Sequence, residues 1–377
     1  MPAKRPFSRA LAVGAVAVLL ALSSLLGALR QQSGMLEMLA EYAGPADYRL
    51  ERINSERWQL LDQEGNSMGE LRLGEGRGYN GPVGVVVKTS SGGEILDVGI
   101  LYHSETPSYV QKLYRRGYLG KLAASTPDQL RGMGPADAVS GATLSSQAVL
   151  QGAQAALGMH EDPHVRGSFS GLQTLWPALL IVLAFALAWA LPRIRPSRLQ
   201  KAAYWLLLVF SLVYLGFAQT QMLSLSRFAA LLSGYFPNIW QQLPFYVLLG
   251  GSLILVFAVR RNLYCQSICP FGAAQEVTGR IGGAKAVPQK LRKPWKWLQW
   301  GVALAVLCLA LILNNPGLAR YEVFGAFFQL TGNALLFGLL IVTVVASLFY
   351  KRPWCRFLCP VDGVFAFFKA LRAALGR

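Results

Sequence analysis

Six long apolar runs limit the fold of this chain more than any other feature. Each is close to the roughly 20 residues that a helix needs to cross about 30 Å of hydrocarbon. Lipid offers no partner to backbone N–H and C=O groups, so such runs form helices. An apolar share of 53% with only 15% charged residues agrees with a polytopic α-helical membrane protein. The predicted spans cover residues 9–29, 172–191, 202–221, 244–259, 298–313 and 334–350.

The distribution of Lys and Arg predicts the orientation of these spans, because cytoplasmic loops are rich in both residues. With a cytoplasmic N-terminus, the inner segments carry 21 basic and 2 acidic residues, and the outer segments carry 15 basic and 17 acidic residues. The net charge of +17 therefore reflects topology, and nucleic-acid binding is not expected. We expect a multi-pass protein of the bacterial inner membrane, with both termini cytoplasmic and residues 31–171 periplasmic.

The first span could also be a cleaved signal peptide. No small-x-small cleavage site follows it before Arg30, so we expect an uncleaved anchor. The expected domains are the N-terminal anchor (1–30), an exported domain (31–171), a second span with an inner loop (172–197) and a duplicated helical region (198–377).

A repeated cysteine motif indicates the duplication. Residues 261–270 (Arg-Asn-Leu-Tyr-Cys-Gln-Ser-Ile-Cys-Pro) align with residues 351–360 (Lys-Arg-Pro-Trp-Cys-Arg-Phe-Leu-Cys-Pro) at an offset of 90. Upstream, residues 225–228 resemble residues 318–321 at nearly the same offset. Each unit is expected to be a helix hairpin that ends in Cys-x3-Cys-Pro on the inner face. Two such hairpins could pack about a pseudo-two-fold axis.

The two motifs together supply four thiolates, the number that a tetrathiolate iron site or an iron–sulfur cluster requires. Structural zinc accepts the same ligands, and four unligated thiols are a further alternative. The matched spacing and flanks favour iron, as one atom or as a cluster. Residues 30–170 contain no cysteine, so a disulfide framework is not expected. Cys308 lies alone inside a span and should be unligated. The expected metal ligands are Cys265, Cys269, Cys355 and Cys359.

The polar stretch contains a second motif at residues 137–146 (Asp-Ala-Val-Ser-Gly-Ala-Thr-Leu-Ser-Ser). It predicts a tight glycine turn that presents a threonine hydroxyl just before a serine-capped helix. A helix N-terminus stabilises a phosphate through its unpaired N–H groups and its dipole. The surrounding domain should be mixed α/β. We expect strands at 82–88 and 94–102, a helix at 145–157, and helical pieces at 35–43 and 108–116.

Residues 75–158 resemble the FMN-binding domain family of the flavoprotein subunits NqrC and RnfG. The resemblance lies in residues 81–87, 93–98 and 103–107 and in the Ser-Gly-Ala-Thr tetrapeptide that ends at Thr143. It implies an α+β domain with FMN joined covalently to Thr143 through a phosphoester, installed by an ApbE-type flavin transferase. The implied turn residues are Ser140, Gly141 and Ala142, and the implied neighbours of the isoalloxazine are His103, Glu105 and Thr106. The alternative for His103 is that it belongs to a polar loop without a role in flavin binding. His160 and His164 are interpreted as parts of a linker next to the membrane.

The whole combination resembles the NosR/PceC group of membrane flavoproteins, which are associated with nitrous oxide reductase and with organohalide reductive dehalogenases. NosR-type proteins typically carry a further ferredoxin module with two more cysteine-rich runs, whereas Cys359 is the last cysteine here. The resemblance thus implies electron exchange with a separate cytoplasmic ferredoxin-like donor or a membrane quinone. An exported reductase would accept electrons from the flavin.

A transmembrane electron-transfer flavoprotein is therefore the leading hypothesis. A NosR-like redox regulator or maturation factor is the main alternative, and a transporter with coincidental motifs is a third. A bilayer of about 30 Å is too wide for one efficient tunnelling step. Either the iron is sunk into the membrane or another carrier intervenes. Arg227 and Arg320 could bind a quinone headgroup, although interface anchoring is the more common role of such residues.

Overall fold

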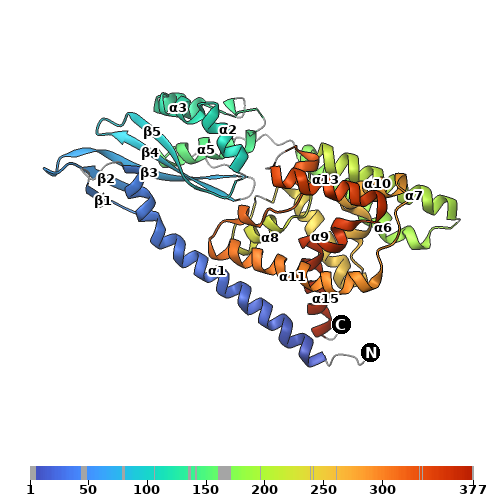
Figure 1. The fold of residues 1–377 in the computed structure, drawn as a ribbon. Coiled ribbons are helices and arrows are strands. Elements are labelled where there is room, and N and C mark those ends of the chain that lie inside the picture. Colours follow the sequence, from blue (N-terminus) through green and yellow to red (C-terminus); the bar gives the residue numbers. More distant parts are fainter. Residues whose placement is uncertain are drawn as a thin grey trace.

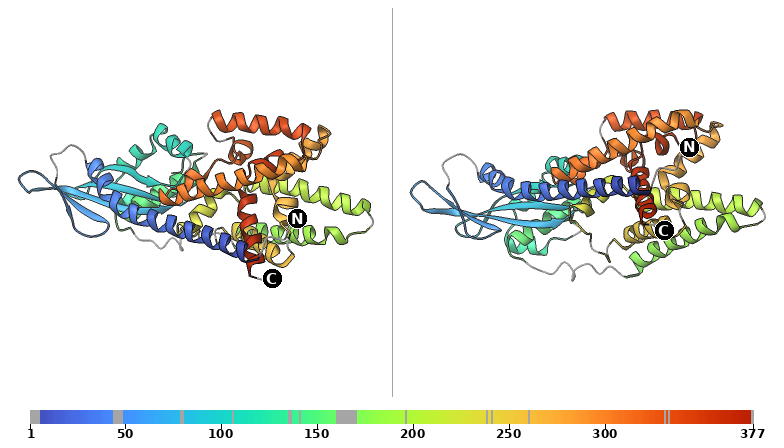
Figure 2. Two further views of the ribbon diagram at one scale, coloured as in Figure 1. Left: turned by 60° about the horizontal axis from the view of Figure 1, so that its bottom comes forward. Right: turned by 90° about the horizontal axis from the view of Figure 1, so that it is seen from below.

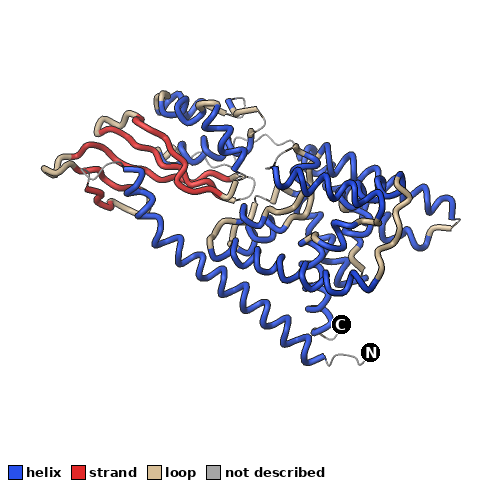
Figure 3. The backbone as a smooth tube through the Cα atoms, in the orientation of Figure 1, coloured by secondary structure: helices blue, strands red, loops and turns tan. Residues whose placement is uncertain are grey.

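The computed structural model describes residues 6–43, 49–78, 81–105, 107–134, 137–140, 142–159, 171–195, 197–237, 239–240, 242–259, 261–330, 332 and 334–375. Two parts are evident, a sheet domain (residues 49–159) and a helical domain (residues 171–375). Figure 1 shows them at opposite ends of the molecule, with one long N-terminal helix running beside both. In Figure 3 all of the strands lie at one end, and the remainder of the described chain is helical or loop.

The sheet is an antiparallel meander in which every strand pairs with its neighbours in sequence. Successive strand side chains point to opposite faces. In the fourth strand, Val83, Val85 and Val87 face one hydrophobic core while Val86 faces another. The strands predicted at 82–88 and 94–102 are confirmed, and three earlier strands were not predicted. The strands are β1 (Arg49–Arg52), β2 (Arg57–Leu61), β3 (Ser67–Arg77), β4 (Pro82–Ser90) and β5 (Ile95–His103).

Four helices cover one face of the sheet, and α5 lies directly on β3. A Cβ atom at Gly74 would come within 2.2 Å of a carbonyl oxygen of α5, and one at Gly76 within 1.7 Å, so glycine permits this close packing. The helices predicted at 108–116 and 145–157 are confirmed. The serine cap is wrong: α5 begins at Thr143 and has no side-chain cap. The helices are α2 (Pro107–Arg115), α3 (Tyr118–Ala123), α4 (Pro127–Gly132) and α5 (Thr143–Ala156).

The opposite face of the sheet is covered by the C-terminal end of α1 (Pro6–Ala43), a continuous helix of 38 residues. Leu39 and Ala43 are buried against the sheet. Toward its N-terminus α1 packs on α11 and α15 of the helical domain, as Figure 2 also shows. At Gly27 a Cβ would lie 2.0 Å from the Leu311 carbonyl oxygen. The helix predicted at 35–43 is thus the end of α1, which runs past the domain boundary expected at residue 30.

The helical domain shows the predicted duplication in its packing. Helix α10, which follows the first cysteine motif, packs on α13, and α15, which follows the second, packs on α9. The elements are α6 (Gly171–Ala190), η2 (Leu191–Arg193), α7 (Ser197–Val209), η3 (Phe210–Ala218), α8 (Leu225–Leu232), α9 (Leu243–Val259), η4 (Tyr264–Ile268), α10 (Pro270–Ile281), α11 (Gln289–Ile312), η5 (Pro316–Ala319), α12 (Phe324–Phe328), α13 (Ala334–Phe349), α14 (Pro353–Phe357) and α15 (Pro360–Ala374).

Within the described chain, four helical stretches are long and apolar enough to cross a membrane. They are Ala10–Arg30, Thr174–Arg193, Ser197–Ala218 and Pro294–Ile312. The other two predicted spans correspond to shorter apolar helices, Leu243–Val259 and Ala334–Phe349. All six predicted spans are therefore apolar helices, and the fold is that of a membrane helix bundle joined to a sheet domain.

Candidate functional site

Thr143 is the first residue of α5, and its side chain is exposed. The first N–H groups of a helix have no partner within the helix, so this position combines a reachable hydroxyl with an anion-binding helix end. Ala142 before it is 5% exposed and belongs to the core of the sheet domain, whereas Ser140 is exposed. The turn is thus held in the core at Ala142 and exposed to solvent at Ser140. Gly141 lies outside the described residues.

Two serines after Thr143 fix the turn onto the helix. The Ser145 hydroxyl donates to the Glu105 carboxylate over 2.5 Å, and both side chains are buried. The Ser146 hydroxyl donates to the Ala142 carbonyl oxygen and accepts from the backbone N–H of Val139. Glu105 therefore lies directly beneath the threonine motif, where it positions the first turn of α5.

His103 ends β5 next to this motif, and its Nδ1 atom is buried without a hydrogen-bond partner among the described residues. Burial lowers the pKa of His103, because a desolvated imidazolium is disfavoured; the backbone and the charge of Glu105 oppose this shift. A neutral imidazole with an unpaired nitrogen suits the polar edge of a bound flavin. Thr106, His160 and His164 lie outside the described residues.

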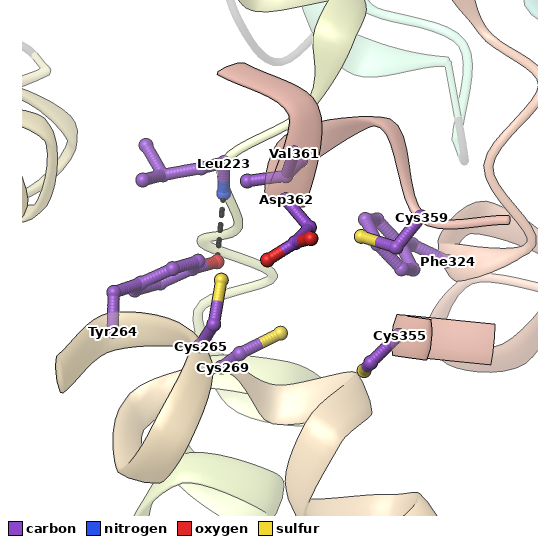
Figure 4. A pocket seen from close by; sticks show the side chains of 9 residues that line it. All are labelled: Leu223, Tyr264, Cys265, Cys269, Phe324, Cys355, Cys359, Val361 and Asp362. Atoms are coloured by element: carbon purple, nitrogen blue, oxygen red, sulfur yellow. Dashed lines mark hydrogen bonds between the residues drawn. The ribbon is translucent and has the colours of Figure 1, made fainter. Parts of the chain in front are cut away.

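The four motif cysteines, from elements far apart in the sequence, line one cavity in the helical domain (Figure 4). Cys265 lies in the π-helical turn η4, and Cys355 in the short helix α14. Cys269 and Cys359 precede α10 and α15 with φ and ψ of −62° and 119°, and −64° and 117°. A proline then begins each helix, a position that tolerates its missing N–H. The repeated sequence thus gives a repeated backbone geometry.

The cavity is also lined by residues from the connections that we expected outside the membrane. Leu223 precedes α8 and Phe324 begins α12, and both border the cavity together with Tyr264. The backbone N–H of Leu223 donates to the Tyr264 hydroxyl over 3.0 Å. Segments that we expected outside the membrane and the cysteine motifs that we expected at the inner face therefore line the same cavity. The outer connections fold inward, and the cavity lies within the bundle.

Hydrogen bonds between the two repeats hold the cavity together. The Arg352 guanidinium donates to the carbonyl oxygens of Cys265 and Gln266 over 2.9 Å each. It also forms an ion pair with Glu276 over 3.0 Å. The Gln275 side chain donates to the Cys355 sulfur over 3.3 Å and accepts from the backbone N–H of Trp354. These contacts fix the distance between the two cysteine motifs.

This donor set fits an iron–sulfur cluster. Thiolates are soft ligands, and the backbone N–H groups of Phe271 and Gly272 face the Cys269 sulfur, as that of Asp362 faces Cys359. In the part of the chain that the structure describes, no three Cys, His, Asp or Glu side chains converge closely enough for a single metal ion. Cys308 lies in α11, away from the cavity-lining set.

A short segment links the cavity to the sheet domain. Phe324 borders the cavity at the start of α12, and Gln329 just after α12 accepts a hydrogen bond from the Tyr109 hydroxyl of α2 over 3.1 Å. Nearby, a Cβ at Gly317 would lie 3.0 Å from the Ser104 carbonyl oxygen. The end of the sheet domain that carries the threonine motif therefore rests on the segment that lines the cavity.

Sequence reasoning identified the four cysteines and Thr143, but it missed the residues that surround them. Tyr264 and Asp362 could have been found, because they occupy defined positions in the repeated motif. Leu223, Phe324 and the Ser145–Glu105 bond carry no local sequence signal, since each depends on contacts between distant segments.

Comparison with known families agrees with both sites. Residues 78–158 match the FMN-binding domain, and residues 242–294 and 331–377 match the 4Fe-4S binding domain. The chain thus joins an FMN-binding domain to a helical part that contains 4Fe-4S-binding segments.

Three curated relatives are similar over part of their length. Protein NirI of Paracoccus denitrificans is 29% identical over 198 residues, covering 49% of this chain and 29% of the relative. Regulatory protein NosR of Pseudomonas aeruginosa is 27% identical over 206 residues, covering 49% and 28%. Putative electron transport protein YccM of Escherichia coli is 27% identical over 146 residues, covering 35% and 40%.

The chain therefore spans well under half the length of each of these relatives. No solved structure matches the chain. Together the matches support a membrane electron-transfer protein that uses FMN and iron–sulfur chemistry.

Proposed function

We propose that this protein passes electrons between an iron–sulfur centre held by Cys265, Cys269, Cys355 and Cys359 and an FMN joined covalently to Thr143. The sheet domain faces the periplasm, and its flavin supplies an exported reductase. Both termini lie in the cytoplasm of a bacterium, and the helices span the inner membrane.

The link through α12 is the observation that carries this proposal. Phe324 borders the cysteine cavity, and Gln329, five positions on, bonds to the sheet domain. At about 1.5 Å per helical residue, the segment advances only about 8 Å. The cavity and the nearest part of the sheet domain, at Tyr109, are therefore separated by protein of less than the bilayer thickness of about 30 Å. This supports a direct exchange of electrons without a third carrier.

The chain's own residues have distinct roles in this scheme. The exposed Thr143 hydroxyl is the acceptor on which an ApbE-type flavin transferase forms the phosphoester, and the N-terminal N–H groups of α5 bind the phosphate. Glu105 and Ser145 hold that helix end in place. His103, kept neutral by burial, offers its unpaired nitrogen to the flavin. FMN and the iron–sulfur centre supply the electron-carrying chemistry.

The partners follow from the position of the cavity. Its sulfurs lie within the bundle, beside the Arg352–Glu276 pair and the basic inner segments. A cytoplasmic ferredoxin-like protein would donate electrons there, with membrane quinol as the alternative donor. The Arg227 guanidinium packs on the Phe245 ring at 4.4 Å and donates to Gln242, which favours a structural role for this residue over quinone binding.

Reconstitution into vesicles tests the proposal. The protein, expressed with a flavin transferase, is oriented with the sheet domain outside, and dithionite-reduced ferredoxin is sealed inside. We expect the outer flavin to bleach, and we expect Cys355→Ser protein to remain coloured because the iron–sulfur centre is lost. An outer flavin that stays oxidised in the wild type, with iron and flavin both present, would overturn electron transfer.

A redox regulator or maturation factor is a second candidate, favoured by the name of one relative, Regulatory protein NosR. It would use the same cofactors but would not sustain turnover. Repeated cycles of bleaching and reoxidation in the vesicle assay favour the electron-transfer role, and a single bleaching event without further cycles favours the regulator.

A further inference from the structure

The two repeats that build the cysteine cavity place different side chains at equivalent positions. At the offset of 90, a phenol in the first repeat corresponds to an indole, a glycine to a carboxylate, and an amide to a phenyl ring. The equivalent pairs are Tyr264 and Trp354, Gly272 and Asp362, and Gln275 and Phe365. The backbone frame is therefore pseudo-symmetric, but its polar groups are not.

The first repeat contributes hydrogen-bond donors to the sulfurs. Tyr264 is 1% exposed, and its oxygen already accepts the backbone N–H of Leu223. Its single proton is therefore free to turn toward the cysteine sulfurs that line the same cavity. Gln275 is 3% exposed, and its amide N–H donates to Cys355 over 3.3 Å while its oxygen is held by Trp354. The hydrogen bonds from Leu223 to Tyr264 and from Trp354 to Gln275 restrict the orientation of both side chains.

The second repeat contributes a backbone N–H group to the Cys359 sulfur, at Asp362, but the side chain of that residue brings a negative charge. Asp362 borders the cavity together with the four cysteines. In Figure 4 its carboxylate points between the sulfurs of Cys265 and Cys359. The sulfur of Cys355, which accepts from Gln275, and the sulfur of Cys269 lie on the other side of the cavity in this view.

We propose that Tyr264, Gln275 and Asp362 set the reduction potential of the iron–sulfur centre and make its two sides unequal. This inference rests on the proposed four-cysteine ligation. Reduction adds negative charge to the iron–thiolate unit, so donors to sulfur stabilise the reduced state and a nearby carboxylate opposes it. These three side chains act as positioning residues, because they bind no iron in this scheme.

A potentiometric titration of the purified, iron-loaded protein, followed by electron paramagnetic resonance, tests the inference. Tyr264→Phe removes one donor without changing the ring, and we expect reduction to become about tenfold less favourable. For one electron this is about 59 mV toward lower potential. Gln275→Leu should shift the potential in the same direction, and Asp362→Asn in the opposite direction. Each protein is first assayed for iron, and the shift is measured on the loaded fraction.

Tyr246→Phe is the matched control. It removes a tyrosine hydroxyl that donates to the Pro237 carbonyl oxygen in the same domain and borders no cysteine. We expect its potential to equal that of the wild type. Equal potentials in Tyr264→Phe and Asp362→Asn, or shifts of the same sign, would overturn the inference while leaving electron transfer intact. A wild-type protein without any reducible iron signal would instead overturn the proposed function.

Discussion

The threonine motif and the cysteine cavity, the two sites that we propose for redox groups, are built in opposite ways. Thr143 is exposed and belongs to one continuous turn and helix, so its geometry depends on nearby residues. The cysteines lie in a cavity that needs two motifs 90 positions apart and inward-folded connections from two further segments. The first site can be modified by an enzyme after folding, and the second must be assembled with the bundle.

Because of this difference, amino-acid substitutions should have different effects at the two sites. A change at Thr143 should remove the attached group without disturbing the fold. A change around the cavity acts on cross-repeat contacts such as those of Arg352 and Gln275, and it affects metal content and packing together. The predictions below test this contrast.

Thr143→Ala should abolish covalent flavin completely. The change removes the hydroxyl and the γ-methyl group of an exposed side chain, so the unfolding free energy should change by no more than about 0.5 kcal/mol. Flavin fluorescence in a denaturing gel measures the attachment. Leu144→Ala, at the exposed next position, is the control and should retain the flavin. A fluorescent Thr143→Ala band would refute this attachment site.

Serine in place of each cavity cysteine should remove most of the bound iron, because a cluster lacking one of four thiolates is poorly held. Iron analysis of the purified proteins measures this. Cys308→Ser, in α11, is the control and should retain the wild-type content. Full iron content in two or more of the Cys265, Cys269, Cys355 and Cys359 variants would reject a shared site.

Ser145→Ala should destabilise the sheet domain by about 2 kcal/mol, because buried Glu105 loses a hydrogen-bond donor. Thermal unfolding of the full-length protein, followed by tyrosine and tryptophan circular dichroism, measures the loss. Ser140→Ala, at an exposed position of the same motif, should have little effect. If the two variants were equally stable, the Ser145–Glu105 bond would not support the motif.

His103 should make the sheet domain less stable as the pH falls. Its pKa in the folded protein is lowered by burial, so below about pH 6.5 the unfolded chain binds a proton that the folded chain does not. The loss is at most about 1.4 kcal/mol per pH unit, down to the folded-state pKa. Unfolding at pH 7 and pH 5 in wild-type and His103→Gln protein measures the difference. A variant that loses as much stability as the wild type would contradict this assignment.

Local patterns in the sequence predicted the features that depend on neighbouring residues. Apolar runs gave the spans, because a helix in lipid needs little beyond its own residues. The repeated motif predicted the four cysteines as metal ligands, and the motif around the glycine turn predicted Thr143 as the attachment residue. The strands β1–β3 were missed because charged residues interrupt their alternation, as in Arg49–Arg52.

The remaining features arise from packing between distant segments. Leu223 and Phe324 reach the cavity only because the outer connections fold into the bundle. Nothing in their local sequence indicates this path, so their place in the cavity lining could not be predicted. Similarly, the contact of Gln329 with Tyr109 joins segments 220 positions apart. These contacts decide how far an electron must travel.

The most direct test of the account is the kinetics of flavin reduction after a laser flash delivers one electron to the iron–sulfur centre in purified, quinone-free protein. Electron exchange through the segment between Phe324 and Gln329 predicts first-order bleaching of the flavin at a rate independent of protein concentration. Bleaching that occurs only when quinone is added, with a rate proportional to quinone concentration, would contradict it.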